Sequence, residues 1–411
     1  MKFKLTKSER QWVFYDVGNS AFTLLISTIM PIYFNHLAEN SGISPVNYLA
    51  YWGYAVSVST LAVAVLGPIF GTMADTKGYK KKIFFLSLLV GVIGCMALGY
   101  TSDWLAFLVI FVVAKIGYSC SLIFYDSMLP DITTVDRMHH VSSLGYAWGY
   151  IGSCIPFLVC LCLVLGSTKI GISMETAMML SFLMIAVWWI LLSIPLIRNY
   201  HQKHFVEEKE HAIQESFKRL GRTFLQIRSK KKIFLFLLAF FFYIDGVYTI
   251  IDMATAYGQA LGLDSAGLLL ALLVTQIVAF PFAILFGRLA ERFHSVQLIT
   301  VCILAYFGIA VFAVFLTNQI QFWILAVCVG MFQGGIQALS RSYFAKIIPA
   351  EQSGEFFGLF DICGKGASFM GTITVSVVSQ RTGNMNLGVG MIAVFFIVGM
   401  ILFRMAAAVK D

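Results

Sequence analysis

The stretch GTMADTKGYKK, residues 71–81, is a charged loop that follows a long apolar segment and returns in altered form later in the chain. Its counterpart, GRLAERFHS at residues 287–295, also follows an apolar segment, at an offset of 216 residues (71 to 287). Two further loops, LPDITTVDRMHHVSSLG at 129–145 and IPAEQSGEFFG at 348–358, form a second pair in the same order. An internal repeat of this kind predicts a chain built from two similar halves.

The composition around these loops is that of a protein with many membrane-spanning helices. Of 411 residues, 59% are hydrophobic and only 12% are charged, about half the charged share of a soluble domain. Apolar runs long enough to cross a bilayer as helices lie at 12–37, 48–73, 83–101, 104–128, 142–166, 174–197, 233–257, 265–287, 297–317, 321–344, 355–379 and 386–405. We therefore predict an all-α polytopic membrane protein with twelve transmembrane helices in two pseudo-symmetric six-helix bundles.

The basic residues are concentrated on one side of the predicted spans. Of 29 Lys and Arg, two lie in loops on the opposite side (Lys169, Arg381), two lie within spans (Lys115, Lys365), and the remaining 25 (29 − 4) flank the first side. Because cytoplasmic loops carry an excess of Lys and Arg, both termini are expected to face the cytoplasm. The net charge of +8 thus reflects orientation in a membrane, and no nucleic-acid partner is expected. The chain has no N-x-[ST] acceptor, which favours a bacterial plasma membrane.

One long polar segment divides the chain. We place an N-terminal six-helix bundle at residues 1–198, a central loop at 199–232 and a C-terminal six-helix bundle at 233–411. Within the loop, apolar residues from Val206 to Ile227 recur at helical spacing between charged ones. This pattern predicts an amphipathic helix on the cytoplasmic membrane surface, with a flexible charged linker as the alternative.

Ionisable residues inside the spans are unevenly distributed. The third, sixth, ninth and twelfth spans carry none in their interiors, whereas other spans hold Asp16, Lys115, Asp126, Asp245, Asp252, Arg341, Asp361 and Lys365. Buried charge must face a protein interior or a water-filled cavity, while an uncharged helix can face lipid. Every third helix is therefore expected at the periphery, and the first of each triplet is expected to line a central cavity. A polar cavity between two such bundles is typical of a transporter.

Two aspartates of the seventh span, in FYIDGVYTIIDMATAYG (242–258), are the leading candidates for a role in this cavity. Asp245 and Asp252 are seven residues apart, so both carboxylates project from one face of a helix. An ionised aspartate at a helix centre costs about 2.5–3.5 kcal/mol to insert, a cost that protonation removes. A carboxylate that gains and loses a proton suits a proton-coupled transporter. Alternatively, both acids form hydrogen bonds or ion pairs that only hold helices together.

The remaining cavity candidates each have a structural alternative. Asp361 and Lys365 are four residues apart and can form an intrahelical pair. Gln333, Gln337 and Arg341 repeat every four residues and form a polar stripe that suits a hydrophilic solute or polar helix packing. Lys115 is a candidate for a solute carboxylate, or for pairing with Asp16 or with an aspartate of the other half. Asp16 and Asn19 lie near the cytoplasmic end of the first span, where gating or helix pairing is expected.

Several stretches carry a resemblance to a known family. GPIFGTMADTKGYKKK (67–82) resembles the loop signature of the major facilitator superfamily. The chain is similar in particular to the vacuole-effluxer-like branch, which includes fungal vacuolar amino-acid exporters. The similarity rests on FYDVGNSAF (14–22), SSLGYAWGYIGS (142–153), FFYIDGVYTI (241–250), QGGIQALSRSYFAKIIP (333–349) and EFFGLFDICGK (355–365). The resemblance implies the major facilitator fold.

The resemblance also implies a gating role for the repeated loops. In the first loop Gly71, Asp75, Gly78, Lys80 and Lys81 match the signature, and Glu291 and Arg292 belong to its repeat. The Asp75 carboxylate is expected to accept hydrogen bonds from the amino end of a neighbouring helix, where the helix dipole favours an anion. Glycines 145, 149 and 152 of SSLGYAWGYIGS are expected to allow close helix packing.

These observations favour a secondary active transporter that moves a small polar organic solute by alternating access. Inside the spans five acids face three bases, which favours coupling to protons through Asp245 and Asp252. The resemblance implies export of amino acids or related metabolites. The expected partners are the solute, protons and the bilayer; the protein is expected to act as a monomer without a metal ion or cofactor. A non-transporting membrane sensor or scaffold with a transporter fold is the alternative. GLFDICGKG (358–366) lacks the spacing of a phosphate loop and no catalytic motif occurs, so an ATP-driven pump or an enzyme is not expected.

Overall fold

The computed structural model of the protein describes residues 4–43, 45–207, 230–260, 263–382 and 384–409, and these are almost entirely helical. Within them, eleven helical segments are long and apolar enough to cross a bilayer. The long helix α15 occupies the remaining place of the twelve expected spans. The predicted fold class is confirmed. The amphipathic helix predicted from the pattern between Val206 and Ile227 falls almost entirely on 208–229, outside the described residues.

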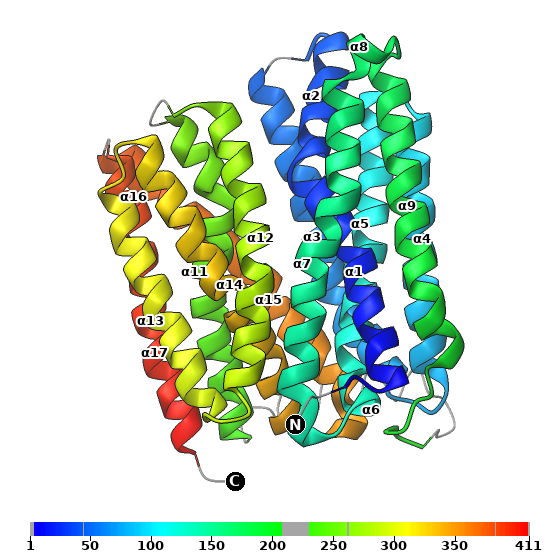
Figure 1. Ribbon diagram of the computed structural model, residues 1–411, viewed down its shortest axis with the longest axis vertical. Coiled ribbons are helices and arrows are strands. Elements are labelled where there is room, and N and C mark those ends of the chain that lie inside the picture. The colour runs from blue at the N-terminus through cyan, green and yellow to red at the C-terminus, as the bar shows by residue number, and fades with distance from the viewer. Residues whose placement is uncertain (1–3, 44, 208–229, 261–262, 383, 410–411) are drawn as a thin grey trace.

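Each half of the chain forms one bundle of helices (Figure 1). The first bundle contains α1 (Lys7–Ser27), α2 (Ile29–Asn40), α3 (Pro45–Ala74), α4 (Tyr79–Ala97), α5 (Trp104–Ser127), α6 (Leu129–Ile132), α7 (Met138–Leu165), α8 (Ser167–Ile170) and α9 (Met174–Asn199). The second contains α11 (Lys231–Ala260), α12 (Ser265–Leu289), α13 (Ser295–Val314), α14 (Gln319–Ile347), α15 (Ser353–Thr382), α16 (Met385–Gly390) and α17 (Ile392–Ala408).

The helix ends follow local sequence signals. Thr6 and Glu9 form a capping box at the start of α1, in which each side chain accepts from the other residue's backbone N–H. Asp103 and Asn318 cap α5 and α14 more simply: one side-chain oxygen of each accepts from a backbone N–H of the first turn. Gly78 precedes α4 with φ of 79°, a left-handed conformation that glycine adopts without strain.

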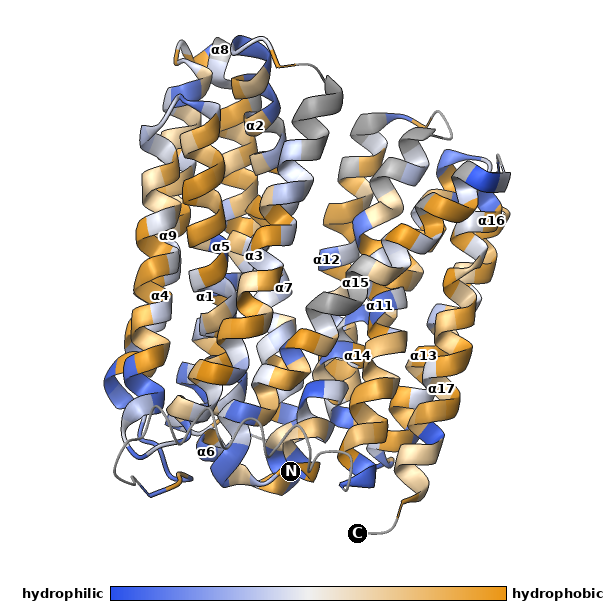
Figure 2. Ribbon diagram, turned by 180° about the vertical axis from the view of Figure 1, so that it is seen from behind, coloured by the Kyte–Doolittle hydropathy of each residue, from blue (hydrophilic) through white to orange (hydrophobic). Residues whose placement is uncertain are grey.

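The bundles have two distinct ends, which we name from the described helices. The basal end holds the start of α1 and the end of α17, and the distal end holds α8 and α16 (Figure 1). Figure 2 shows that hydrophobic residues cover the sides of both bundles, whereas hydrophilic residues gather toward the ends. Such a surface suits a bilayer around the sides and water at both ends.

The uncharged helices are peripheral, as expected. In both views α4 and α9 lie at one edge of the molecule and α13 and α17 at the other (Figures 1 and 2). The bundles pack against each other mainly through α3 with α15 and through α7 with α12. Within the first bundle, α7 approaches α1 so closely at Gly152 that an added Cβ would stand 2.4 Å from Val17 Cγ1. The predicted packing role of this glycine is confirmed.

Candidate functional site

A polar cavity of about 360 Å³ lies between the two bundles. It is lined by α1, α5 and α7 of the first bundle and by α11, α12, α14 and α15 of the second. Seven of its lining residues are aromatic: Tyr118, Tyr146, Tyr150, Tyr248, Phe240, Phe357 and Phe360. Its charged lining residues are Asp16, Asp126, Asp252, Asp361 and Arg341. The cavity therefore combines ring faces with an excess of carboxylates.

Arg341 of α14 forms the most extensively bonded part of this lining. Its side chain is only 2% exposed, and its Nη1 and Nη2 lie 2.9 Å from Asp126 Oδ1 and 3.5 Å from Asp16 Oδ2. Its Nε and Nη2 also donate to the hydroxyl and carbonyl of Ser142, each at 2.9 Å. The guanidinium further stacks near the rings of Trp12, Tyr125 and Tyr146, the closest centroid being 4.2 Å away. Arg341 thus joins the second bundle to the first.

Most of the predicted cavity residues line the cavity. Asp16, Asn19, Asp252, Gln333, Gln337 and Asp361 are lining residues. Gln337 Oε1 accepts from the Tyr150 hydroxyl at 2.8 Å, which links α14 to α7. Asp16 accepts from Tyr125 at 3.0 Å, in addition to its pair with Arg341.

Two predicted lysines are not part of the described lining. Lys115 of α5 is half-buried, with Nζ 5.8 Å from the centroid of the Phe111 ring. Lys365 is on α15, and its side chain lies outside the described part of the structure.

Asp245 lies away from the cavity in which we expected it. Its side chain is fully buried between α11 and α15. The Oδ1 atom accepts from the Gly371 backbone N–H at 3.0 Å and from the Thr249 hydroxyl at 3.2 Å. Within the described part of the chain, Oδ2 has no hydrogen-bond partner. The physical reason is that α15 packs against α11 beside Asp245, while the space between the bundles is open beside Asp252, two turns further along α11.

The sequence places Arg341 in a polar stripe with Gln333 and Gln337, and it marks Asp126 as a charge inside a span. Neither pattern predicts the ion pair between Arg341 and Asp126. The lining tyrosines Tyr118, Tyr146 and Tyr150 gave no such signal, since tyrosine is common on the packed faces of membrane helices.

At the basal end, Asp75 connects the two bundles. The side chain is completely buried, and its two oxygens accept from the backbone N–H groups of Gly354 at 2.7 Å and Glu355 at 3.0 Å. These groups lie in the first turn of α15, so the carboxylate meets the positive end of the helix dipole. This is the contact that the sequence predicts for Asp75. Gly71 permits the approach, since an added Cβ would stand 2.3 Å from the Gly354 carbonyl oxygen.

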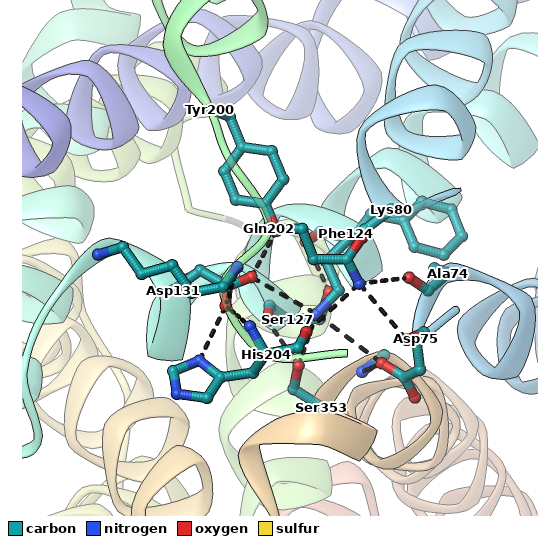
Figure 3. A network of polar contacts seen from close by, with 12 residues as sticks. Ala74, Asp75, Lys80, Phe124, Ser127, Asp131, Tyr200, Gln202, His204 and Ser353 are labelled. Atoms are coloured by element: carbon teal, nitrogen blue, oxygen red, sulfur yellow. Dashed lines mark hydrogen bonds and ion pairs between the residues drawn. The ribbon is translucent and has the colours of Figure 1, made fainter. Parts of the chain in front are cut away.

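Lys80 completes this contact from the start of α4 (Figure 3). It is also fully buried, and its Nζ donates to Ser353 Oγ at 2.7 Å. The same Nζ lies 3.8 Å from Asp75 Oδ1 and 3.8 Å from Asp131 Oδ2. A buried lysine between two carboxylates is a paired charge, which is the condition under which such burial is tolerated.

Asp131 in α6 holds the chain segment that follows α9 (Figure 3). Its carboxylate accepts from the Tyr200 hydroxyl, from the backbone N–H of Lys203 at 3.1 Å and from that of His204 at 2.8 Å. Beyond His204, Val206 pairs with the backbone at Asp75, its N–H donating to the Asp75 carbonyl at 2.8 Å. We call residues 200–206, at the start of the central loop, the basal strap, because they cover the Asp75 loop.

The other predicted gating residues are more exposed. Lys81 Nζ lies 3.4 Å from the Arg198 carbonyl, and the Gly78 N–H donates to Gln202 of the basal strap. Glu291 lies 3.2 Å from His140 Nδ1 of α7, which joins the bundles at the repeated loop. Arg292 is exposed at the basal surface.

Two similar helical bundles, a polar cavity between them and a basal loop that contacts the opposite bundle together define a transporter of the major facilitator type. Among solved structures, the chain is similar to the major facilitator transporter FucP in its outward conformation, with a TM-score of 0.75, 15% identity and 98% of each chain covered. At that identity the likeness concerns the fold.

Sequence relatives place the chain more narrowly. It is 44% identical over 407 residues to the uncharacterized MFS-type transporter YxiO of Bacillus subtilis (strain 168), covering 98% of this chain and 95% of that protein. It is also 26% identical over 271 residues to autophagy-related protein 22-1 of Aspergillus fumigatus, covering 59% of this chain and 44% of that protein. The model of the vacuole effluxer Atg22-like family matches residues 44–410. The chain belongs to this family.

Proposed function

We propose that this protein moves a small polar organic solute across a bacterial plasma membrane by alternating access. The observation that carries the proposal is the polar cavity between the bundles, bounded toward the basal end by the pairs of Arg341 with Asp16 and Asp126. Among the described residues, the hydrogen bonds and ion pairs that join the bundles lie from Tyr150 and Gln337 toward the basal end. If these contacts broke and the distal end closed, the same cavity would open to the basal side of the membrane.

The orientation and coupling are part of the same proposal. Since the basal loops carry most of the Lys and Arg residues, the basal end faces the cytoplasm. Asp245 is the proposed proton carrier, because a fully buried carboxylate with one unpartnered oxygen is more easily accommodated when it is neutral. Export of amino acids or related metabolites is the proposed physiological direction, in keeping with the name of the family.

A flux experiment tests the proposal. Purified protein in liposomes is given a panel of radiolabelled amino acids and other small metabolites, with and without an imposed pH gradient. We expect the gradient to accelerate accumulation of at least one solute. Asp245→Asn should abolish that acceleration but retain exchange of internal for external solute, whereas Asp103→Asn, an exposed helix cap, should behave as wild type. Proton-driven accumulation that survives in Asp245→Asn contradicts the coupling role.

A further inference from the structure

Among the described residues that line the cavity, carboxylates outnumber basic groups. Four carboxylates and one guanidinium belong to the described lining. The guanidinium is enclosed, because Arg341 is 2% exposed and shared between Asp126, Asp16 and three aromatic rings. An anionic group of a solute would have to displace these partners to reach Arg341. The cavity is therefore better suited to a cation than to an anion.

Asp252 is the carboxylate best placed to meet a solute. It lies on α11, its side chain is exposed within the cavity lining, and it is separated by two helical turns from the enclosed Asp245. Tyr118, Tyr248 and Phe360 line the same cavity, and aromatic faces attract ammonium groups.

Gln333 supplies a second, independent indication of a hydrogen-bond donor in the ligand. Its side chain is 6% exposed and lines the cavity, yet its Oε1 has no hydrogen-bond partner among the residues that the structure describes. A buried amide oxygen without a donor costs free energy, and the hydrogen-bond donor of a ligand removes that cost. An ammonium group carries several such donors and a charge complementary to Asp252.

A small apolar side pocket opens beside Gln333. It has a volume of about 40 Å³ and shares Ile251, Gln276 and Gln333 with the cavity. Leu325 and Val329 of α14 are among its other walls. Since a water molecule needs roughly 10–15 Å³ on this measure, the pocket has room for about three non-hydrogen atoms. A short alkyl group fits its size and its apolar walls.

We propose that the cavity recognises an organic amine: an ammonium group held by Asp252 and Gln333, with a short apolar group in the side pocket. Recognition does not require a carboxylate on the solute, because Arg341 is already occupied. This inference rests on the proposed transport function, since it names the class of solute that the same cavity binds.

Binding of matched probes to the purified protein tests the assignment without the leakage of free amines across vesicles. Calorimetry in detergent compares 3-methylbutylamine with the neutral 3-methylbutan-1-ol, the anionic 4-methylpentanoate, and leucine. We expect the amine to bind at least about tenfold more tightly than the alcohol, the loss typical of a removed charged hydrogen bond, and the acid to bind more weakly still. Methylamine, which lacks the apolar group, should also bind more weakly. The assignment is overturned if the alcohol or acid binds as well as the amine, if leucine binds and the amine does not, or if no probe binds.

Two variants assign the binding to the named residues. Asp252→Asn should weaken the amine at least about tenfold and leave the alcohol unchanged, and Gln333→Leu should weaken the amine by a smaller factor. Asp103→Asn is the matched control, because it makes the same chemical change at a cap outside the cavity and asparagine also caps helices. Unchanged amine affinity in Asp252→Asn contradicts the role of that residue.

Solute flux separates this inference from the proposed function. If the amine binds but no solute of any class is moved by reconstituted protein, transport fails while amine recognition stands. If solutes without an ammonium group are moved and the amine does not bind, transport stands while amine recognition fails.

Discussion

The two repeated loops occupy equivalent places in the fold but differ in how they join the bundles. In the first loop, Asp75 is fully buried and accepts two backbone hydrogen bonds from the start of α15. In the second, Glu291 is 34% exposed and lies 3.2 Å from a single histidine, His140 of α7. Both loops approach closely, since a Cβ added at Gly71 or Gly287 would stand within 2.7 Å of the opposite bundle.

The two halves of the repeat therefore share the close approach of the helices but differ in the chemistry of the contacts. The contact of Asp75 combines charge, a helix amino end and exclusion of water, each of which strengthens a hydrogen bond. The contact of Glu291 is partly exposed to solvent and is an ion pair only when His140 is protonated, and exposed ion pairs contribute little. We therefore expect the first loop to supply most of the free energy that keeps the basal end closed.

Removing the charge of Asp75 should have the largest effect. Asp75→Asn loses the charge-assisted hydrogen bonds to Gly354 and Glu355 and should destabilise the basal-closed state by about 2–3 kcal/mol. Spin labels at Lys77→Cys and Glu351→Cys, both exposed at the basal end, should report a larger population with long distances between the labels. The control Asp136→Asn changes an exposed acid of the same end and should leave the distances unchanged. An unaltered distance distribution in Asp75→Asn argues against this contact as the main basal closure.

A methyl group at either loop glycine tests the close approach itself. Gly71→Ala places Cβ against the Gly354 carbonyl oxygen at 2.3 Å, whereas Gly287→Ala meets Ser143 Cβ at 2.7 Å. Overpacking typically costs 1–3 kcal/mol. Gly71→Ala should therefore destabilise the basal-closed state by about 2 kcal/mol, and Gly287→Ala should destabilise it by less. The same pair of labels measures both. A larger effect from Gly287→Ala would reverse the ranking of the two loops.

Within the described residues, the basal strap covers the Asp75 loop and not the second loop. Changing its anchor, Tyr200, should have a smaller effect on stability than the changes above. Tyr200→Phe removes the hydroxyl that donates to Asp131 and should lower the free energy of unfolding by about 1 kcal/mol, seen as a lower Tm in detergent. Burial, and then the adjacent Asp131 charge, raise the pKa of Tyr200 well above its usual range. Because the pKa of Tyr200 is higher in the folded state, the contribution of its hydroxyl to stability is complete at any pH below the pKa of the unfolded state, near 10. This contribution is lost only as the pH rises through the pKa of the folded state. The difference between Tyr200→Phe and wild type should therefore be constant from about pH 6 to 9, and a difference that vanishes within this window contradicts the assignment.

Much of the architecture could be predicted from sequence, because bilayer burial acts on each helix separately. Apolar length gave the spans, and the absence of charge placed α4, α9, α13 and α17 at the edges. The loop signature gave the acceptor role of Asp75, since helix amino ends attract carboxylates wherever they meet.

The details of the cavity could not be predicted in the same way. Asp245 and Asp252 share a helix face by spacing, yet only Asp252 lines the cavity, since α15 covers the α11 surface near Asp245. The pair of Arg341 and Asp126 depends on how two bundles meet, and no periodicity within one helix reports that. Sequence patterns describe single helices well, whereas sites between helices depend on rotation and tilt set by packing.

The smallest expected effect comes from the second loop and completes the comparison. Glu291→Gln and His140→Ala each remove one partner of the contact. Since the Glu291 side chain is about one-third exposed, the coupling energy of the two residues in a double-mutant cycle should stay below about 1 kcal/mol. Added salt should reduce this coupling further, because exposed charges are screened, whereas the basal opening caused by Asp75→Asn should depend little on salt, since Asp75 is buried. Label distances at low and high ionic strength measure both responses. A coupling at the second loop that equals the effect of Asp75→Asn and resists salt would mean that the two repeats close the basal end equally.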